Sequence, residues 1–496
     1  MRVTRREFLR LAALTAATAA VQACSPVYRQ LAGDPILPAG WHSISGNWTF
    51  SVLNRLTFGA RLEERQLAEQ IGLAGWIEEQ LSPNALDDSA TDWRVRAFDS
   101  LHMTADELDG WEKRDVIAEL KQATILRQVY SKRQLYEIMV EFWSDHFNIA
   151  ITKGLVWMLK TVDDREVIRA NALGNFGDLL RASAHSPAML IYLDNQANHK
   201  DHPNENYARE LMELHSLGVD GGYTQEDVME LARCLTGWSV KKHFWPGEFT
   251  FNTDVHDMNE KVFLGRDIRP EGIGEGEFAL EILAAHPSTA QHIAQKLVRR
   301  FVSDQPMEEA GWLVERAANA FQSTNGDIQA VLRVVLLDGL AAMSEIPSPK
   351  FKRPLHYVAS ALRLMNAESD GSLALHEALS LMGQPSFQWP TPDGPPDTSS
   401  AWLGNLLPRW QFSLELTQNQ LAKTYIDWEN LLAISGAQDP AELADLLGVL
   451  LLGSPLPETG RDDLLRDFES SGVKEMNEIA PILAAGLLAS PNFQYR

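Results

Sequence analysis

Apolar residues recur along most of the chain at intervals of three and four, the spacing that places them on one face of an α-helix. The longest such stretch covers residues 113–147 and is interrupted near Tyr130–Ser131. From residue 401 to the end the pattern is helical again. The other predicted helical stretches are residues 50–56, 63–81, 161–193, 205–217, 225–237, 278–303, 309–338 and 350–366. The pattern therefore predicts an all-α (mainly α) protein built as one large multi-helical body.

Two regions break this helical rhythm. Two short apolar runs within residues 247–265, separated by a polar stretch, predict one small β-hairpin insertion. Its tip would carry Asp254, His256 and Asp257. The Pro-rich residues 384–396 cannot form a helix, and we expect them to pack their aromatic side chains onto the body as the lip of a cleft.

The most polar part of the chain, residues 194–206, contains no large apolar residue. Its polar side chains belong to Asp194, Asn195, Asn198, His199, Asp201, His202, Asn204, Glu205 and Asn206. Asn204 suits the N-cap of the helix that follows, and Gly218 suits its C-terminal stop. The density of side chains that can bind a ligand favours a functional site here.

The polar face of this helix carries Glu205, Arg209, Glu210 and Glu213. The spacing of Glu205, Arg209 and Glu213 also fits a solvated face held by ion pairs, each worth about 0.2–0.5 kcal/mol. Periodicity alone leaves both interpretations open.

His146 lies in the middle of the apolar arc at the end of the 113–147 stretch. A buried imidazole needs an orienting partner, and the neighbouring Asp145 and Glu141 are the candidates on the same helix. His146 is therefore either a hydrogen-bonded core residue or a metal ligand. The acidic stripe of Glu137, Glu141 and Asp145 is by itself expected to be solvated.

The net charge of the chain disfavours two classes of binding partner. The formal net charge is −23 over 496 residues. Such an acidic surface argues against binding to the backbone of nucleic acids and disfavours adsorption onto anionic lipid. The length is sufficient for a sizeable hydrophobic core.

The N-terminus has the features of an export signal. Arg5 and Arg6 precede the apolar stretch Leu11–Val21, as in a twin-arginine signal, and this stretch is too short to span a membrane. Val21–Cys24 resembles a lipoprotein processing box. We favour lipidation of Cys24 over cleavage at a nearby small-residue site, so that a lipid would be the only membrane attachment.

This interpretation divides the chain into three parts. Residues 1–24 form the signal, residues 25–47 a linker and residues 48–496 the helical domain. The mature protein is expected in the periplasm or on the outer surface. Lipidation of Cys24 would leave Cys234 as the one remaining cysteine, so no intramolecular disulfide could form.

Several motifs together resemble a bacterial family catalogued as domain of unknown function 1800. They are Arg55–Gly59, Phe142–Phe147, Pro187–Asn195, Pro203–Leu214, Gly221–Thr224, Leu235–Trp238, His256–Asp257 with Lys261, Gly383–Gln384 and Ser490–Phe493. The block Asn204–Leu214 is the most specific of these, whereas His199 and His202 lie outside the family pattern.

The resemblance covers the chain from about residue 48 to its end and implies an exported, largely helical protein without an established activity. Genes of this family often neighbour those of a second exported family, of unknown function 1501, which is similar to sulfatases and alkaline phosphatases. The resemblance thus implies a sulfatase-like partner in the cell envelope.

Our first hypothesis is an exported metal-assisted or acid–base hydrolase acting on an envelope or extracellular polymer. Carboxylates and imidazoles together suit a divalent metal ion, and a carboxylate can act as general base. The predicted catalytic residues are Glu205, Arg209, Glu210 and Glu213, and the predicted metal ligands are His146, Asp194, His256 and Asp257. These groups would have to meet at one cleft.

The alternative is a non-catalytic envelope protein that binds or matures the sulfatase-like partner. The polar block would then be a buried structural network or a docking surface. The chain contains no G-x-S-x-G, H-E-x-x-H, P-loop or dinucleotide-binding motif that would identify a familiar enzyme. Geometry separates the hypotheses, because an enzyme needs these side chains to converge on an open pocket.

The export signal can be tested directly. Replacing Arg5 and Arg6 by Lys should retain the precursor in the cytoplasm, because the twin-arginine pathway reads the paired guanidinium groups. Cell fractionation measures this, and normal export of the double variant would reject the signal. Cys24→Ala should release the mature protein from the membrane fraction if a lipid holds it there.

Overall fold

The computed structural model describes residues 47–241, 247–345, 350–469 and 475–496. The predicted export signal, its lipidation site Cys24 and the linker up to residue 46 lie outside these residues. The described part contains 22 α-helices, α3 to α24, and three two-stranded sheets. The prediction of a mainly α protein is therefore confirmed.

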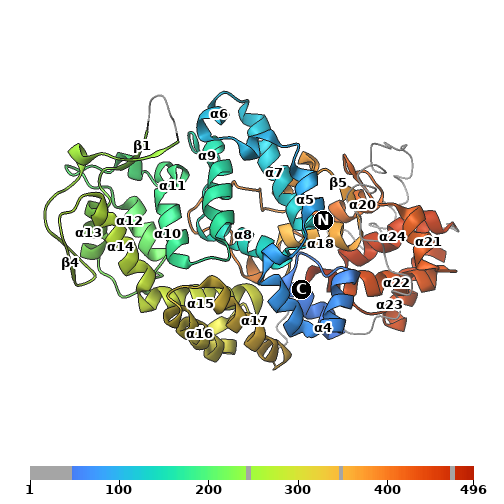
Figure 1. Ribbon diagram of the computed structural model, residues 1–496. Helices are drawn as coiled ribbons and strands as arrows, with labels where there is room; N and C mark the ends of the chain where they lie inside the picture. The colour runs from blue at the N-terminus through green and yellow to red at the C-terminus, as the bar shows by residue number, and fades with distance from the viewer. Residues whose placement is uncertain (1–46, 242–246, 346–349, 470–474) are drawn as a thin grey trace.

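The helices of the first half follow one another with short connections (Figure 1). They are α3 (Asn47–Leu56), α4 (Leu62–Gln80), α5 (Ser89–Val95), α6 (Ala105–Asp109), α7 (Lys113–Tyr130), α8 (Gln134–His146), α9 (Val156–Asp163), α10 (Phe176–His185), α11 (Pro187–Tyr192), α12 (Glu205–Glu213) and α13 (Gln225–Cys234). The predicted break near Tyr130–Ser131 thus separates α7 from α8.

The helices of the second half are also mostly short. They are α14 (Ile273–Ala285), α15 (Pro287–Phe301), α16 (Pro306–Ser323), α17 (Ile328–Glu345), α18 (Pro354–Leu364), α19 (Leu373–Leu381), α20 (Leu406–Thr417), α21 (Trp428–Ser435), α22 (Pro440–Leu452), α23 (Glu458–Glu469) and α24 (Met476–Ala489). No helix or strand is assigned to the Pro-rich residues 384–396, as predicted.

Helix α8 lies near the centre of the molecule, between two groups of helices (Figure 1). Helices α10 to α14 lie on one side of it, and α18 with α20 to α24 lie on the other. Helices α15, α16 and α17 pack against one another along one edge. Ten of the thirteen residues of α8 are buried, so this helix forms part of the core rather than of the surface.

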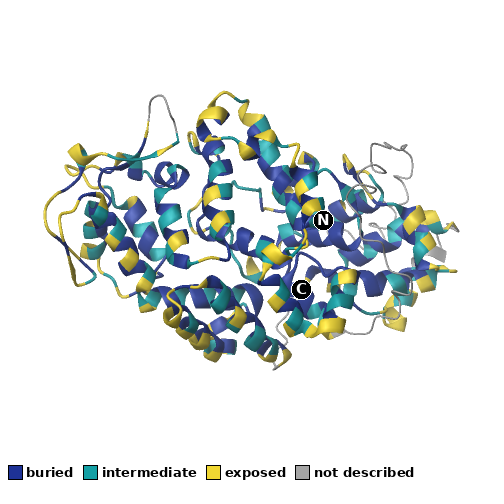
Figure 2. Ribbon diagram, viewed as in Figure 1, coloured by how far each residue is buried: buried dark blue, intermediate teal, exposed yellow. Residues whose placement is uncertain are grey.

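One hydrophobic cluster connects these groups, from Phe50 in α3 to Phe493 near the C-terminus. Buried residues lie on the inner faces of the helices, and exposed residues lie mainly on their outer faces (Figure 2). This distribution is what an amphipathic helix requires when it packs on a common core. None of the helices that the structure describes is long and apolar enough to cross a membrane.

A π-helix, Asp164–Arg169, continues directly from α9. Such segments are rare, and they occur frequently at functional sites because the extra residue in the turn redirects side chains. The sequence predicted helix through this region without distinguishing its type.

The strands pair differently from the predicted hairpin. β2 (Phe249–Phe251) pairs with β1 (Trp238–Val240), and β3 (Lys261–Phe263) pairs with β4 (Arg266–Ile268). A third sheet joins the two-residue strands β5 (Glu368–Ser369) and β6 (Thr424–Tyr425).

The reason for this pairing is a tight turn after β3. Leu264 and Gly265 both have positive φ, 47° and 71°, which is the conformation of a two-residue turn that joins adjacent antiparallel strands. The apolar run that starts at Lys261, which forms β3, therefore pairs with β4, the strand that follows it. His256 and Asp257 lie in the connection between two hairpins, and their predicted place at a hairpin tip was wrong.

Helix α12 begins at the predicted N-cap, since the Asn204 side chain accepts a hydrogen bond from the amide of Asn206. It ends at Glu213, earlier than predicted. Gly218, at φ 82°, closes the turn beyond it by donating its amide hydrogen to Met212 O at 3.1 Å. A side chain at position 218 would collide with the His292 ring.

Candidate functional site

The acidic stripe of α8 is buried, contrary to the prediction that it is solvated. Glu137 and Glu141 are only 4% and 6% exposed, and the side chain of Asp145 is 21% exposed. Burial of three carboxylates on one helix requires compensating positive charge. That charge comes from distant parts of the sequence.

Arg300 in α15 and Arg353 just before α18 supply this charge. Arg353 contacts Oε1 of Glu141, and Arg300 Nη1 donates to its Oε2 at 3.1 Å. His356 Nε2 is a third partner at 2.8 Å. Burial opposes ionisation, but Arg353, His356 and Arg300 hold the pKa of Glu141 well below its usual range.

Asp145 shares both arginines with Glu141. Its Oδ2 accepts hydrogen bonds from Arg353 Nη2 at 2.7 Å and Arg300 Nη2 at 3.3 Å. Burial, together with the neighbouring Glu141 charge, outweighs the arginines and raises the pKa of Asp145. The pKa values of the two carboxyl groups are thus shifted in opposite directions, an arrangement used in acid–base catalysis.

Both carboxylates line a small cavity of about 70 Å³ whose walls are otherwise largely apolar. The other polar residues that line it are Thr124, Gln128, Ser144, Asn148, Asp164, His376, Gln384 and Ser386. His376 Nε2 and Gln128 Oε1 are buried without a hydrogen-bond partner among the described residues. Since such atoms are costly in a folded protein, they are available to a small polar group that enters the cavity.

The Pro-rich residues 384–396 form one wall of this cavity. Asn148 Nδ2 donates to the carbonyls of Trp389 and Thr391 at 3.1 and 2.7 Å, and the Tyr192 hydroxyl donates to Pro390 O at 3.0 Å. The side chains of Phe387 and Trp389 line the cavity. The predicted packing of these aromatic residues onto the helical body is confirmed.

The π-helix connects this cavity with a larger pocket. Asp164, its first residue, lines the cavity, and Arg169, its last residue, lines a pocket of about 590 Å³. Arg169 Nε donates to Asp164 Oδ2 at 2.9 Å, and its Nη atoms donate to Glu137 at 3.0 Å. An ion-pair group thus lies between the two spaces.

His146 is buried as predicted, but its partners are not Asp145 or Glu141. Lys296 Nζ donates to its Nδ1 at 2.7 Å, so Nε2 carries the hydrogen that is donated to His215 O at 3.1 Å. The rings of His215 and His292 lie 5.9 and 6.3 Å from the His146 ring. Burial lowers the pKa of all three imidazoles.

The predicted catalytic residues of α12 lie on a half-exposed face. Arg209 pairs with Glu205 at 3.0 Å and with Glu213 at 3.6 Å, and Gln225 of α13 donates to Glu205 at 2.8 Å. Of the two interpretations that periodicity left open, this arrangement matches the face held by ion pairs. Burial, Glu213 and the nearby Asp393 raise the pKa of Glu210.

The predicted metal ligands each have different partners. Asp194 pairs with Lys153 at 2.7 Å, His256 Nε2 with Glu275 at 2.9 Å, and Asp257 with Arg233 at 2.7 Å. His146 is held by His215 and Lys296. Within the described ranges, no three His, Cys, Asp or Glu side chains are grouped closely enough to hold a metal ion.

The predicted convergence on one cleft is therefore not found. The segments that carry these residues are nevertheless neighbours. Lys200 N donates to Val255 O at 2.8 Å, and the His146 side chain donates to the carbonyl of His215, just beyond α12. Their side chains, however, face separate partners. The catalytic and metal-binding roles of these residues stay predictions.

The sequence interpretation missed Arg300, Arg353, His356 and His376. One signal was available: Lys350, Lys352 and Arg353 place three cations within four residues directly before a helix, in a chain that is otherwise acidic. Such a cluster matches a buried acidic stripe, but nothing local indicates which stripe.

The contact between the Pro-rich segment and α8 can be tested at Gly394. This residue has φ 72°, and a Cβ there would collide with the Asp145 carbonyl. Gly394→Ala should lower the free energy of unfolding by about 1–3 kcal/mol, measured by urea titration. Gly436→Ala is the matched control, because Gly436 has a similar φ of 68° and a Cβ there meets nothing within 4 Å. Equal stabilities of the two variants would contradict the contact.

The histidine cluster predicts acid sensitivity. Burial lowers the pKa of His215 from 6.5 to about 3 and that of His292 to about 4. Below pH 6.5 the unfolded chain binds protons that the folded imidazoles do not, so the free energy of unfolding decreases as the pH is lowered. The decrease is about 1.4 kcal/mol per pH unit for each histidine.

Urea titrations between pH 7 and pH 4 measure this slope. His292→Gln should reduce this slope by about 1.4 kcal/mol per pH unit, the contribution of one proton. His102→Gln, at an exposed position, is the control. An unchanged slope in His292→Gln would show that this imidazole is not protected from protonation.

Comparison with known proteins agrees with the motifs. The family model described as "Protein of unknown function (DUF1800)" matches residues 51–495. No curated protein and no solved structure matches the chain. The matched range includes α8, the π-helix, α12 and both cavities. The resemblance stated from the sequence is confirmed, and the chain belongs to the DUF1800 family.

Proposed function

We propose that the protein is an acid–base hydrolase that acts, after export, on an envelope or extracellular polymer. The carboxylate pair Glu141 and Asp145 carries this proposal. Both line the same cavity and share Arg300 and Arg353, yet their pKa values move in opposite directions. Pairs of this kind can assign one carboxyl group to proton transfer and keep the other ionised.

Asp145 is the proton-transfer group in this proposal. Arg300 and Arg353 both bind its Oδ2, and no hydrogen bond to Oδ1 is made within the described part of the chain. Its raised pKa favours the protonated form that donates to a leaving group. Glu141, whose two oxygens are bound by Arg300, Arg353 and His356, stays ionised and holds the arginines in place.

His376 is proposed to orient the substrate. Its Nδ1 lies 2.9 Å from Ser386 Oγ, and the residue lines the cavity. Burial lowers the pKa of His376 to about 3, so the ring is neutral. A neutral imidazole can exchange a hydrogen bond with a hydroxyl or amide group.

The metal-assisted form of the hypothesis has less support from geometry, because its four predicted ligands face separate partners. The proposal assigns no step to a metal ion. Export by the twin-arginine route, attachment through Cys24 and a location in the periplasm or on the outer surface are retained as proposals from the sequence.

A non-catalytic role as binding or maturation partner of the sulfatase-like protein is the second candidate. The supporting observation is the α12–α13 face. Arg209 and Glu205 are half-exposed and mutually paired there, while Val219 and Met229 are 68% and 46% exposed. Apolar side chains beside a charged ladder are typical of an interaction surface.

Asp145→Asn tests the hydrolase. The purified protein is assayed against labelled peptidoglycan and labelled extracellular polysaccharides. Removal of the proton-transfer group should lower the rate about a hundredfold or more, with little change in melting temperature because Asn is nearly isosteric.

Asp109→Asn, the same substitution at an exposed position at the end of α6, is the control and should retain the rate. Full activity of Asp145→Asn would overturn the assignment. If the unmodified protein hydrolyses no polymer, while Arg209→Glu abolishes co-purification with the sulfatase-like protein, the second candidate replaces the first.

A further inference from the structure

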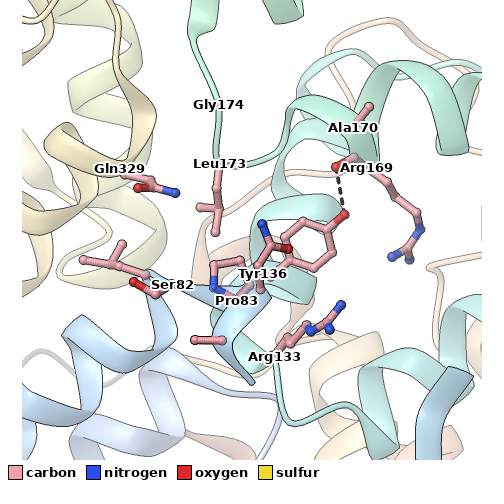
Figure 3. A pocket seen from close by; sticks show the side chains of 12 residues that line it. Ser82, Pro83, Arg133, Tyr136, Arg169, Ala170, Leu173, Gly174 and Gln329 are labelled. Carbon is pink, nitrogen blue, oxygen red and sulfur yellow. Dashed lines mark hydrogen bonds between the residues drawn. The ribbon is translucent and has the colours of Figure 1, made fainter. Parts of the chain in front are cut away.

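The pocket of about 590 Å³ lies at the N-terminal end of α8, on the other side of the π-helix from the carboxylate cavity. Its volume falls in the range of small-molecule sites, about 300–1,000 Å³. Polar residues line it from four segments: Ser82 and Asn84, Arg133 and Tyr136, Arg169, and Gln329 of α17. The guanidinium of Arg169 turns away from the other lining residues toward Glu137 and Asp164 (Figure 3). The space is therefore large enough for a ligand and is lined by side chains that can orient one.

The charge of this pocket is unlike that of the whole protein. The chain carries a formal net charge of −23, yet both charged residues that line the pocket are arginines. The charge of Arg169 is offset by Glu137 and Asp164, which lie behind it.

Arg133 forms no ion pair with any described residue, and the nearby carboxylate of Asp87, whose pKa it helps to lower, is exposed, so solvent screens that charge. Arg133 Nη2 donates to the carbonyl of Leu86 at 3.2 Å, and its Nε is buried without an acceptor. In the residues described here, no carboxylate lies within ion-pair distance of it. The pocket wall thus includes one guanidinium group that forms no ion pair among the described residues.

The neutral walls suit a ligand with both hydroxyl groups and apolar faces. The Tyr136 hydroxyl donates to Arg169 O at 2.7 Å, which fixes the aromatic ring as a wall (Figure 3). Leu173 and Pro83 add apolar surface. Ser82, Asn84 and Gln329 supply hydrogen-bonding groups without charge.

We propose that this pocket binds a sugar that carries a carboxylate, with the carboxylate on Arg133 and the hydroxyl groups on Ser82, Asn84 and Gln329. A planar guanidinium matches a carboxylate with two parallel hydrogen bonds. The one guanidinium of the pocket that forms no ion pair within the described chain matches the single charge of a uronic acid, and a phosphate would bring more negative charge than this group carries. The aromatic and aliphatic walls contact the C–H faces of the sugar ring.

This inference goes beyond the proposed hydrolase, because it concerns a different pocket and requires no turnover. Binding is measured on the purified full-length mature protein by titration calorimetry and by ligand-observed NMR. The probes are glucuronate, its uncharged counterpart glucose, and glutarate, which has carboxylates but no sugar. Glucuronate should bind at least about tenfold more tightly than glucose or glutarate.

Arg133→Gln should weaken glucuronate binding about tenfold or more and leave the residual affinity equal to that for glucose. Arg114→Gln is the matched control, since Arg114 is highly exposed on α7 and does not line the pocket. Melting temperatures verify that the variants are folded. Gln329→Ala provides a second measurement if Arg133→Gln does not fold, and it should weaken glucuronate but not glutarate.

Three results would overturn the proposal. Equal affinities for glucuronate and glutarate would mean that only a carboxylate is recognised, as in an acidic-peptide site. Tighter binding of inorganic phosphate than of glucuronate would replace the sugar acid by a phosphate. No binding, or binding that survives both Arg133→Gln and Gln329→Ala, would remove the site. None of these outcomes bears on Asp145, so the two proposals fail separately.

Discussion

The ionised carboxylate of Glu141 is buried at the centre of the molecule, and much of the surrounding architecture serves to compensate it. Transfer of a charge out of water costs several kcal/mol even after relaxation, unless partners replace the water. Arg300, Arg353 and His356 do so from α15 and α18. Arg300 is shared in turn with Asp397, 2.9 Å away, which ties the residue that directly follows the Pro-rich segment to the same centre.

This compensation explains why two groups of helices stay together although their sequences are far apart. Apolar packing joins them over one hydrophobic cluster, but such packing tolerates sliding and repacking. The guanidinium groups bind the α8 carboxylates in fixed directions. They therefore determine where the walls of the carboxylate cavity lie, and where the Pro-rich segment crosses α8.

Local features of the fold were predictable, and long-range ones were not. The break after Tyr130 and the start of α13 at Thr224 depend on neighbouring residues: Thr224 Oγ1 accepts from the Asp227 amide at 3.2 Å, as a capping box requires. The strand pairing failed because two short apolar runs can each pair with several others. The two-residue turn at Leu264–Gly265 selects the pairing of β3 with β4, and the sequence prediction did not take this turn into account.

The candidate site shows the same limit. Helical periodicity placed Glu137, Glu141 and Asp145 on one side of α8, but it contains no information about what that side faces. The arginines that compensate Glu141 and Asp145 lie 155 to 212 residues away. Conversely, the polar residues 194–206 look like a site because they are dense, whereas Asn195 and Asn198 are buried amides that bind backbone carbonyls of the following segments. Density of polar groups did not separate ligand binding from loop architecture.

The separation of Glu141 from Arg353 has a consequence for biosynthesis. At about 5–20 residues per second, the 212 residues between them take a ribosome roughly 10–40 s to add. Until Arg300 is added, 159 residues after Glu141, the carboxylates of Glu141 and Asp145 have no guanidinium partner, so this end of α8 favours water while its apolar arc favours burial. The nascent first half therefore cannot reach its final packing, and it is the stage at which this chain is most exposed to aggregation and to proteases. Completion of the second half ends that exposure in one step.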